Sequence, residues 1–169
     1  MALRDALLPE FDQEMATARK HLERVPEGKF GWKPHEKSGS MGWLAGHIAD
    51  IPDWAVVGIT KDSVDLAPGG VHVPHPVPPA TRGALLEMFD KNVAAARTAI
   101  AGAEDASLHQ NWSLLMNGKP ILTIPRTGVL RSFVMNHLVH HRAQLGLYLR
   151  LNDIPVPSTY GPSADESGI

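Results

Sequence analysis

The chain has 169 residues, of which 20% are charged and 43% hydrophobic, and its formal net charge at pH 7 is −2. This is an ordinary globular composition, and the near-neutral charge provides no basic surface for nucleic acid or for anionic membranes. Because the chain has no cysteine, a metal site must use nitrogen and oxygen ligands, and a reactive thiol must be supplied from outside.

Neither a targeting signal nor a membrane span is expected. The N-terminus lacks the basic and apolar regions of a signal peptide, and no apolar run approaches the about 20 residues that cross a bilayer. We therefore expect a cytoplasmic protein with a single domain over residues 1–169. Its proline-rich tail, residues 153–169, is expected to be irregular.

Two helical segments are predicted in the first third of the chain. The first runs from about Leu7 to Val25, and Pro9 is compatible only with its first turn. After a stretch rich in proline and glycine, the second begins with Ser38 or Ser40 as its N-cap and extends to about Ile59. Residues 61–80 are again rich in proline and are predicted to be a long crossing loop.

The rest of the chain predicts two more helices separated by a hairpin. Thr81 is the expected N-cap of the third helix, which ends at Gly102. Between the apolar runs of residues 112–124, Asn117-Gly118 is the typical signal of a β-hairpin turn. The fourth helix covers about 126–151, so the expected fold is all-α: a four-helix bundle with a small hairpin between helices 3 and 4.

Three histidines lie where helical periodicity points them inward. At about 100° per residue, His137 and His141 fall along the middle of the fourth helix's apolar stripe, one turn apart, with Arg142 on the opposite side. His47 is at the centre of the stripe of the second helix. Three imidazoles from two helices predict a metal site that keeps open positions, as catalytic sites do.

Other interpretations of these histidines stay open. A buried histidine is often a hydrogen-bonded core residue without a metal. His140 lies about 60° from His137, so it could replace His141 or join as a fourth ligand, but we expect it beside the site. Asp50 and Gln144 are expected to orient an imidazole or touch a bound ligand. No residue is indicated as a general acid or base.

Several remaining residues are assigned to structure rather than to chemistry. Trp43 and Trp54 are expected to be core anchors. His72 and His75 lie in the proline-rich stretch and are expected to face solvent.

Four sequence elements together resemble the DinB/YfiT-like superfamily of metal-binding four-helix bundles over nearly the full chain. The elements are Gly31-Trp32-Lys33-Pro34, the run from Ser40 to His47, the His-rich run from Asn136 to Gln144, and Pro155-Val156-Pro157. The His-rich run is the most specific of the four. The resemblance implies an up-down-down-up bundle, frequent homodimers, and a divalent ion bound by His47, His137 and His141.

The same resemblance implies a function. Members include bacillithiol-dependent and mycothiol-dependent transferases and isomerases, so we expect a metal-dependent S-transferase using a low-molecular-weight thiol, or a hydrolase, acting on small electrophiles. Zn²⁺ or Ni²⁺ is the expected ion, with Fe²⁺ or Mn²⁺ as alternatives. The expected partners are a small-molecule substrate and a second copy of the chain. The rival hypothesis is a non-catalytic, stress-associated module that binds a metal and a ligand.

Overall fold

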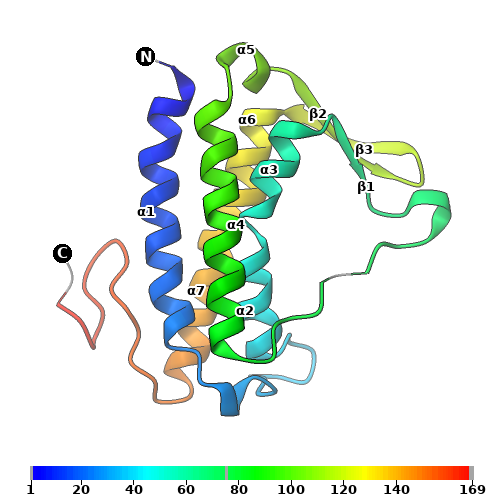
Figure 1. Cartoon of the computed structure of the whole chain (residues 1–169). Helices are drawn as coiled ribbons and strands as arrows, with labels where there is room; N and C mark the ends of the chain where they lie inside the picture. Colours follow the sequence, from blue (N-terminus) through cyan, green and yellow to red (C-terminus); the bar gives the residue numbers. More distant parts are fainter. Residues whose placement is uncertain (1, 75, 168–169) are drawn as a thin grey trace.

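The computed structural model describes residues 2–74 and 76–167, which form a mostly helical fold with a small three-stranded sheet (Figure 1). No helix in this part of the chain is long and apolar enough to cross a membrane. The longer helices are α1 (Leu3–Glu23), α2 (Met41–Asp50), α3 (Asp53–Thr60), α4 (Arg82–Gly102) and α7 (Asn136–Arg150). The shorter helical pieces are η1 (Glu27–Lys29), η2 (Pro68–Gly70), α5 (Asp105–Leu108), α6 (Arg126–Val129) and the π-helical segment η3 (Leu130–Met135).

Helix α1 starts earlier than its periodicity predicts, at Leu3 rather than Leu7. The extension has a tertiary cause, because the backbone N–H of Leu3 donates a hydrogen bond to Oδ1 of Asp105 at 2.9 Å. Pro9 therefore lies beyond the first turn, which corrects the prediction. The buried face of the helix includes Phe11, Met15, Ala18 and Leu22.

The predicted second helix is divided into α2 and α3. Ser40 is its N-cap, since Oγ accepts a hydrogen bond from the backbone N–H of Trp43 at 3.1 Å. The division falls at Pro52, which has no N–H to continue the ladder of backbone hydrogen bonds. The helical dihedrals of Pro52 (φ −60°, ψ −28°) nevertheless keep the chain turning in the same sense into α3.

The expected hairpin is confirmed and is part of a larger sheet. Strands β2 (Asn111–Met116) and β3 (Lys119–Pro125) are antiparallel, and Asn117 and Gly118 join them with φ angles of 51° and 74°. Both angles are positive, as the mirror-image hairpin turn requires. Residues 61–80 were predicted to be loop, yet β1 (Ser63–Asp65) pairs with β2 in parallel. A three-residue strand with a partner distant in sequence leaves no periodic signal.

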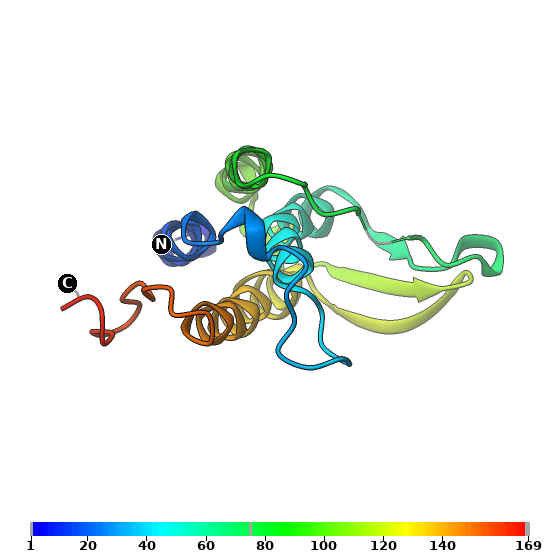
Figure 2. The ribbon, with the colours of Figure 1, turned by 90° about the horizontal axis from the view of Figure 1, so that it is seen from below.

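The sheet extends away from the helices on the side of α2 and α3 (Figure 2). Arg126 anchors its base. This buried guanidinium donates from Nη2 to the carboxylate of Asp62 at 2.6 Å. From Nη1 it donates to three carbonyls around the end of α3, those of Gly58, Ile59 and Lys61, at 2.7, 2.8 and 2.6 Å. These bonds satisfy helix-end carbonyls that have no partner within α3.

The predicted fourth helix is a continuous run of α6, η3 and α7. A π-helical turn bonds residue i to i+5 and so holds an extra residue. Consequently the buried face of the helix includes Leu138 and Arg142. The prediction that Arg142 lies on the polar side is wrong, because the residue is only 2% exposed. His137 and His141 are half-buried at the edge of the core instead of at its centre.

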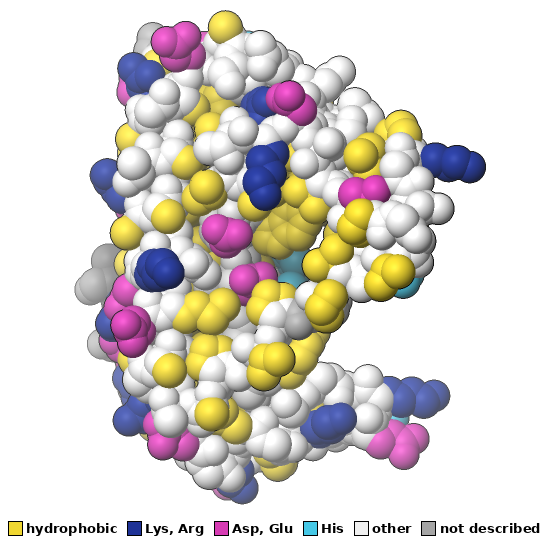
Figure 3. All heavy atoms as spheres, turned by 45° about the vertical axis from the view of Figure 1, so that its right-hand side comes forward, with side chains coloured by type: hydrophobic (Ala, Val, Ile, Leu, Met, Phe, Trp, Pro, Cys, Tyr) yellow, Lys and Arg dark blue, Asp and Glu magenta, His cyan; other side chains and the backbone are white. Residues whose placement is uncertain are grey.

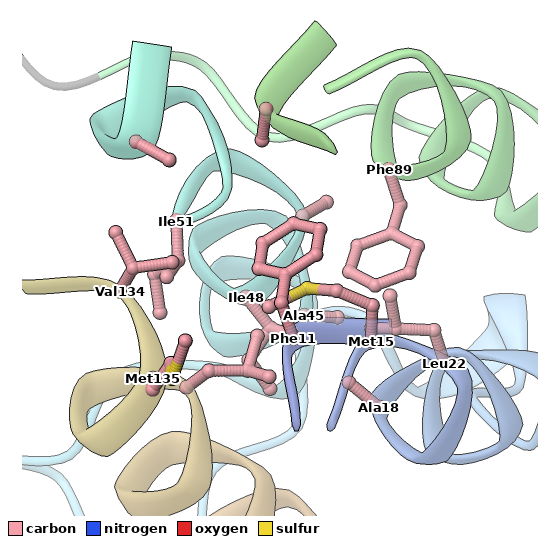
Figure 4. Packing of buried hydrophobic residues seen from close by; sticks show 14 of the residues in the cluster. Phe11, Met15, Ala18, Leu22, Ala45, Ile48, Ile51, Phe89, Val134 and Met135 are labelled. Carbon is pink, nitrogen blue, oxygen red and sulfur yellow. The ribbon is translucent and has the colours of Figure 1, made fainter. Parts of the chain in front are cut away.

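The hydrophobic core lies where α1, α2, α4 and the η3–α7 run face one another. Helices α1 and α2 each pack against both α4 and α7. Thr81 caps α4 as predicted, with Oγ1 accepting from the N–H of Ala84 at 3.2 Å. Figure 4 shows side chains from all these elements meeting, among them Phe11, Met15, Ile48, Ile51, Phe89, Val134 and Met135.

Candidate metal centre

Three imidazoles from two helices converge at one edge of the core. Nε2 of His137 lies 3.2 Å from Nε2 of His47 and 2.9 Å from Nε2 of His141. The ligand atoms of all three residues lie within 4.8 Å of one another, and all three side chains are half-buried. The structure thus brings together the three histidines that the sequence predicted as ligands.

Hydrogen bonds on the far side of two rings indicate how their protons are placed. Nδ1 of His141 lies 2.8 Å from Oε1 of Gln144, an atom that only accepts, so Nδ1 carries the proton in the neutral ring. A hydrogen bond with the backbone of Phe133 raises the pKa of His137, and its Nε2 faces the other two rings. With Nδ1 of His141 protonated, the Nε2 lone pair of His141 is directed at Nε2 of His137 across 2.9 Å and is available to a cation.

This donor set fits a divalent ion. Two nitrogens each about 2.0–2.1 Å from a tetrahedral zinc ion are about 3.3–3.4 Å apart. The separations of 3.2 and 2.9 Å differ from that value by a few tenths of an ångström, a shift that small rotations of the rings supply. Imidazole nitrogens suit zinc, nickel, copper and iron, so the donor set leaves the identity of the metal undecided.

Burial lowers the pKa of both histidines on α7. For His137 desolvation is the largest cause, the Phe133 hydrogen bond opposes it, and the nearby His140 lowers the pKa further. For His141 desolvation again comes first and the Gln144 hydrogen bond opposes it. A lowered pKa keeps both rings neutral at physiological pH, which is the form that ligates a metal.

The residues expected beside the site lie in three different positions. Gln144 contacts His141 directly. His140 is exposed, and its ring centroid lies 4.8 Å from that of His141. Asp50, on the last turn of α2, lines the pocket next to His47.

Trp43 does not have the position predicted for it. Its side chain is 39% exposed rather than a core anchor. The indole stacks on the ring of His47, with centroids 5.2 Å apart and planes at 12°. A stacked indole restricts the rotation of that imidazole.

A pocket of about 410 Å³ opens beside the three histidines, and both His47 and His137 line it. Figure 3 shows a hollow between the helices and the arm formed by the sheet, with histidine side chains at its floor. Its other walls include Trp54, Val64, Leu66, Leu114 and Phe133. Sequence analysis missed the strand contribution, because it depends on the pairing of β1 with β2.

None of the other histidines that the structure describes belongs to this group of close ligand atoms. His72 is exposed, as predicted, and His75 lies outside the described residues. His21 is 2% exposed between α1 and α7, where its Nδ1 lies 3.0 Å from the carbonyl oxygen of Thr17. It is the kind of hydrogen-bonded core histidine that was the alternative interpretation for the other three.

Comparison with known proteins adds a family and a fold. The family model of the DinB superfamily matches residues 10–145. A DinB-like protein from Bacillus cereus has a TM-score of 0.70 at 20% identity, covering 92% of this chain and 97% of that chain. A DinB-like protein from Bacillus subtilis has a TM-score of 0.67 at 15% identity, covering 91% of this chain and 96% of that chain. A mutant of a mycothiol-dependent maleylpyruvate isomerase has a TM-score of 0.50 at 12% identity, covering 90% of this chain and 62% of that chain. No curated protein matches the chain.

Proposed function

The chain belongs to the DinB superfamily, and we propose that it is a divalent-metal-dependent enzyme whose ion is held by His47, His137 and His141. The observation that carries this proposal is the convergence of three imidazole nitrogens at the wall of an open pocket. Three protein ligands leave positions for water or substrate, which favours a catalytic site over a closed structural one. Zn²⁺ and Ni²⁺ are the first candidates.

The proposed reaction is transfer of a low-molecular-weight thiol to a small electrophile, with hydrolysis as the second candidate. A bound divalent ion lowers the pKa of a coordinated water or thiol, so that the nucleophilic anion exists near neutral pH. The chain has no cysteine, so the thiol would enter as a substrate. The mycothiol-dependent isomerase named above, which shares the fold, supports a thiol ahead of water.

The chain's own side chains have defined tasks in this proposal. Gln144 holds His141 with its Nε2 lone pair directed at the other two rings. Trp43 restrains the ring of His47 by stacking on it. The apolar walls of the pocket remove water from around a bound electrophile, which strengthens polar interactions with the site.

We also infer that the longer helices form the up-down-down-up four-helix bundle implied by the family. The four helices of this bundle would be α1, the α2–α3 pair, α4 and the α6–η3–α7 run. The mutual packing of α1 and α2 with α4 and α7 supports this arrangement (Figure 1).

Elemental analysis after loading with several divalent ions tests the metal site. We expect about one ion per chain in the wild type and near-complete loss in His137→Ala. His140→Ala is the matched control, because it removes a neighbouring exposed histidine and should keep the ion. Equal metal content in all three proteins would contradict the assignment.

Turnover tests the enzymatic part of the proposal. Model electrophiles are incubated with the metal-loaded protein, with and without added thiol, before and after chelation. We expect thiol-dependent turnover that chelation abolishes. A bound ion that stabilises the protein while every electrophile stays unreacted would favour the non-catalytic module.

A further inference from the structure

We propose that the pocket beside the three histidines binds an apolar, ring-sized group of the substrate, and that its wall at Asp50 and Asp65 disfavours an anionic substituent on that group. This inference deepens the proposed function and rests on it, because the pocket shares His47 and His137 with the candidate metal centre. It names the class of electrophile that the enzyme would accept.

The size and lining of the pocket indicate an apolar group. Its volume of about 410 Å³ is within the range of small-molecule sites. Trp54 from α3 and Phe133 from η3 form one aromatic wall, with ring centroids 5.8 Å apart. Leu66 and Leu114 provide an aliphatic wall from the sheet side. A flat apolar ring between two such walls removes apolar surface from water on both faces.

The aromatic wall is supported from behind by Trp112. This side chain is fully buried, and its ring lies 6.3 Å from that of Trp54 and 6.0 Å from that of Phe133, both edge-on. A buried neighbour restricts both rings to one arrangement. A preformed wall binds a ring without the entropic loss of ordering its own side chains.

The charge on one part of the lining disfavours anionic groups. Asp50 and Asp65 are the charged residues among the described lining residues, and no lysine or arginine occurs among them. The carboxylate of Asp65 accepts hydrogen bonds from the backbone N–H groups of Ala67, Asn117 and Gly118, at 2.9, 2.9 and 2.7 Å. These bonds hold the pKa of Asp65 below its ordinary value, so the group stays ionised. An anionic group beside Asp50 and Asp65 would lose hydration and be repelled, whereas a cation there would be attracted. A divalent ion at the histidines would attract an anion to itself, so the effect of the carboxylates is measured in protein without the ion.

Two exposed valines on the same segment allow the charge to be changed without disturbing the core. Val73 lines the pocket and is 56% exposed, and its backbone N–H donates to the carbonyl of Leu66 at 2.9 Å. Val71 is 72% exposed and does not line the pocket. Val73→Lys therefore adds a cation at the rim, and Val71→Lys is its matched control.

The experiment measures binding of three isosteric probes by titration calorimetry: 4-methylbenzamide, 4-methylbenzoate and 4-methylbenzamidinium. Both metal-loaded and chelated full-length protein are used, because benzoate can also ligate a metal. In the chelated protein we expect benzoate to bind at least about tenfold more weakly than the benzamide, and the amidinium to bind at least as well. Val73→Lys should lower the ratio of the benzoate dissociation constant to the benzamide dissociation constant at least about threefold. Val71→Lys should leave this ratio within about twofold of the wild-type value.

The outcomes separate this inference from the proposed function. Benzoate binding as tight as benzamide in the chelated protein, or no response of the ratio to Val73→Lys, would overturn the inference. His141→Ala removes a candidate metal ligand that is not among the lining residues of the pocket, so it should keep the order of the three probes. If the wild-type protein bound no metal and still bound the three probes in the expected order, the inference about the ligand would hold and the proposed metal-dependent function would be wrong.

Discussion

Oε1 of Gln144, one turn after His141 on α7, lies 2.8 Å from Nδ1 of His141. This contact fixes which nitrogen of the His141 ring faces the other two histidines. Gln144→Ala removes this support while all three candidate ligands remain. Loss of such an outer hydrogen bond weakens metal affinity by about 10–100-fold. Competition with a chromogenic chelator measures the change, and Gln13→Ala, an exposed glutamine on α1, serves as control. Unchanged affinity in Gln144→Ala would mean that the bond does not orient the ligand.

Gly46 allows the segment after β1 to lie directly on α2. A Cβ atom added at Gly46 would be 2.7 Å from Cβ and 3.1 Å from Cα of Pro78, so the backbone of that segment would have to move. We expect Gly46→Ala to lower the free energy of unfolding by about 1–3 kcal/mol and to weaken binding of 4-methylbenzamide. Denaturant unfolding and calorimetry test both effects. Gly83→Ala on α4, where a Cβ meets nothing within 4 Å, should show neither.

A buried ion pair joins α1 to α7. Nη1 of Arg142 donates to Oε2 of Glu14 at 2.6 Å, and Tyr160 from the tail hydrogen-bonds both partners. Arg142→Leu leaves the Glu14 carboxylate buried without its cation, so the free energy of unfolding should fall by about 3–5 kcal/mol.

The double variant Arg142→Leu/Glu14→Leu should recover much of that loss, because the uncompensated charge is gone. Urea unfolding of both variants provides the comparison. Arg97→Ala, which breaks the exposed ion pair with Asp12, should change stability by less than about 1 kcal/mol. A double variant as unstable as the single one would show that the loss comes from packing.

Acidification should destabilise the chelated protein through His21. Burial is the main cause of its lowered pKa relative to the ordinary 6.5, and the hydrogen bond with the Thr17 carbonyl only partly opposes it. Below about pH 6.5 the unfolded chain therefore takes up a proton that the folded chain does not, so stability falls as pH falls.

For one such group the slope approaches about 1.4 kcal/mol per pH unit. We expect His21→Gln to have a shallower dependence of the free energy of unfolding between pH 7 and pH 5 than the wild type. His109→Gln, an exposed control, should leave the slope unchanged. His137 and His141 have pKa shifts in the same direction and account for a remaining slope.

The candidate site shows where sequence reasoning succeeds and where it stops. The spacing of His137 and His141 placed both rings on one helix face, and His47 was found from its place in a second periodic segment. Their depth was predicted incorrectly, because the π-helical turn η3 changes the phase of the helix and puts Leu138 and Arg142 into the core. A π-helical turn has no periodic sequence signal that would have revealed the change.

By itself the sequence determined the cap at Thr81, the turn at Asn117-Gly118 and the histidine pair of α7, since each depends on residues a few positions apart. It narrowed the cap of the second helix to Ser38 or Ser40, and the structure decided for Ser40. Only the tertiary structure decided the pocket and its charge. Its walls come from β1, β2, α3 and η3, and their meeting requires pairing and packing between residues distant along the chain. Such contacts form only when the burial of the whole core outweighs the entropy of closing the loops between them.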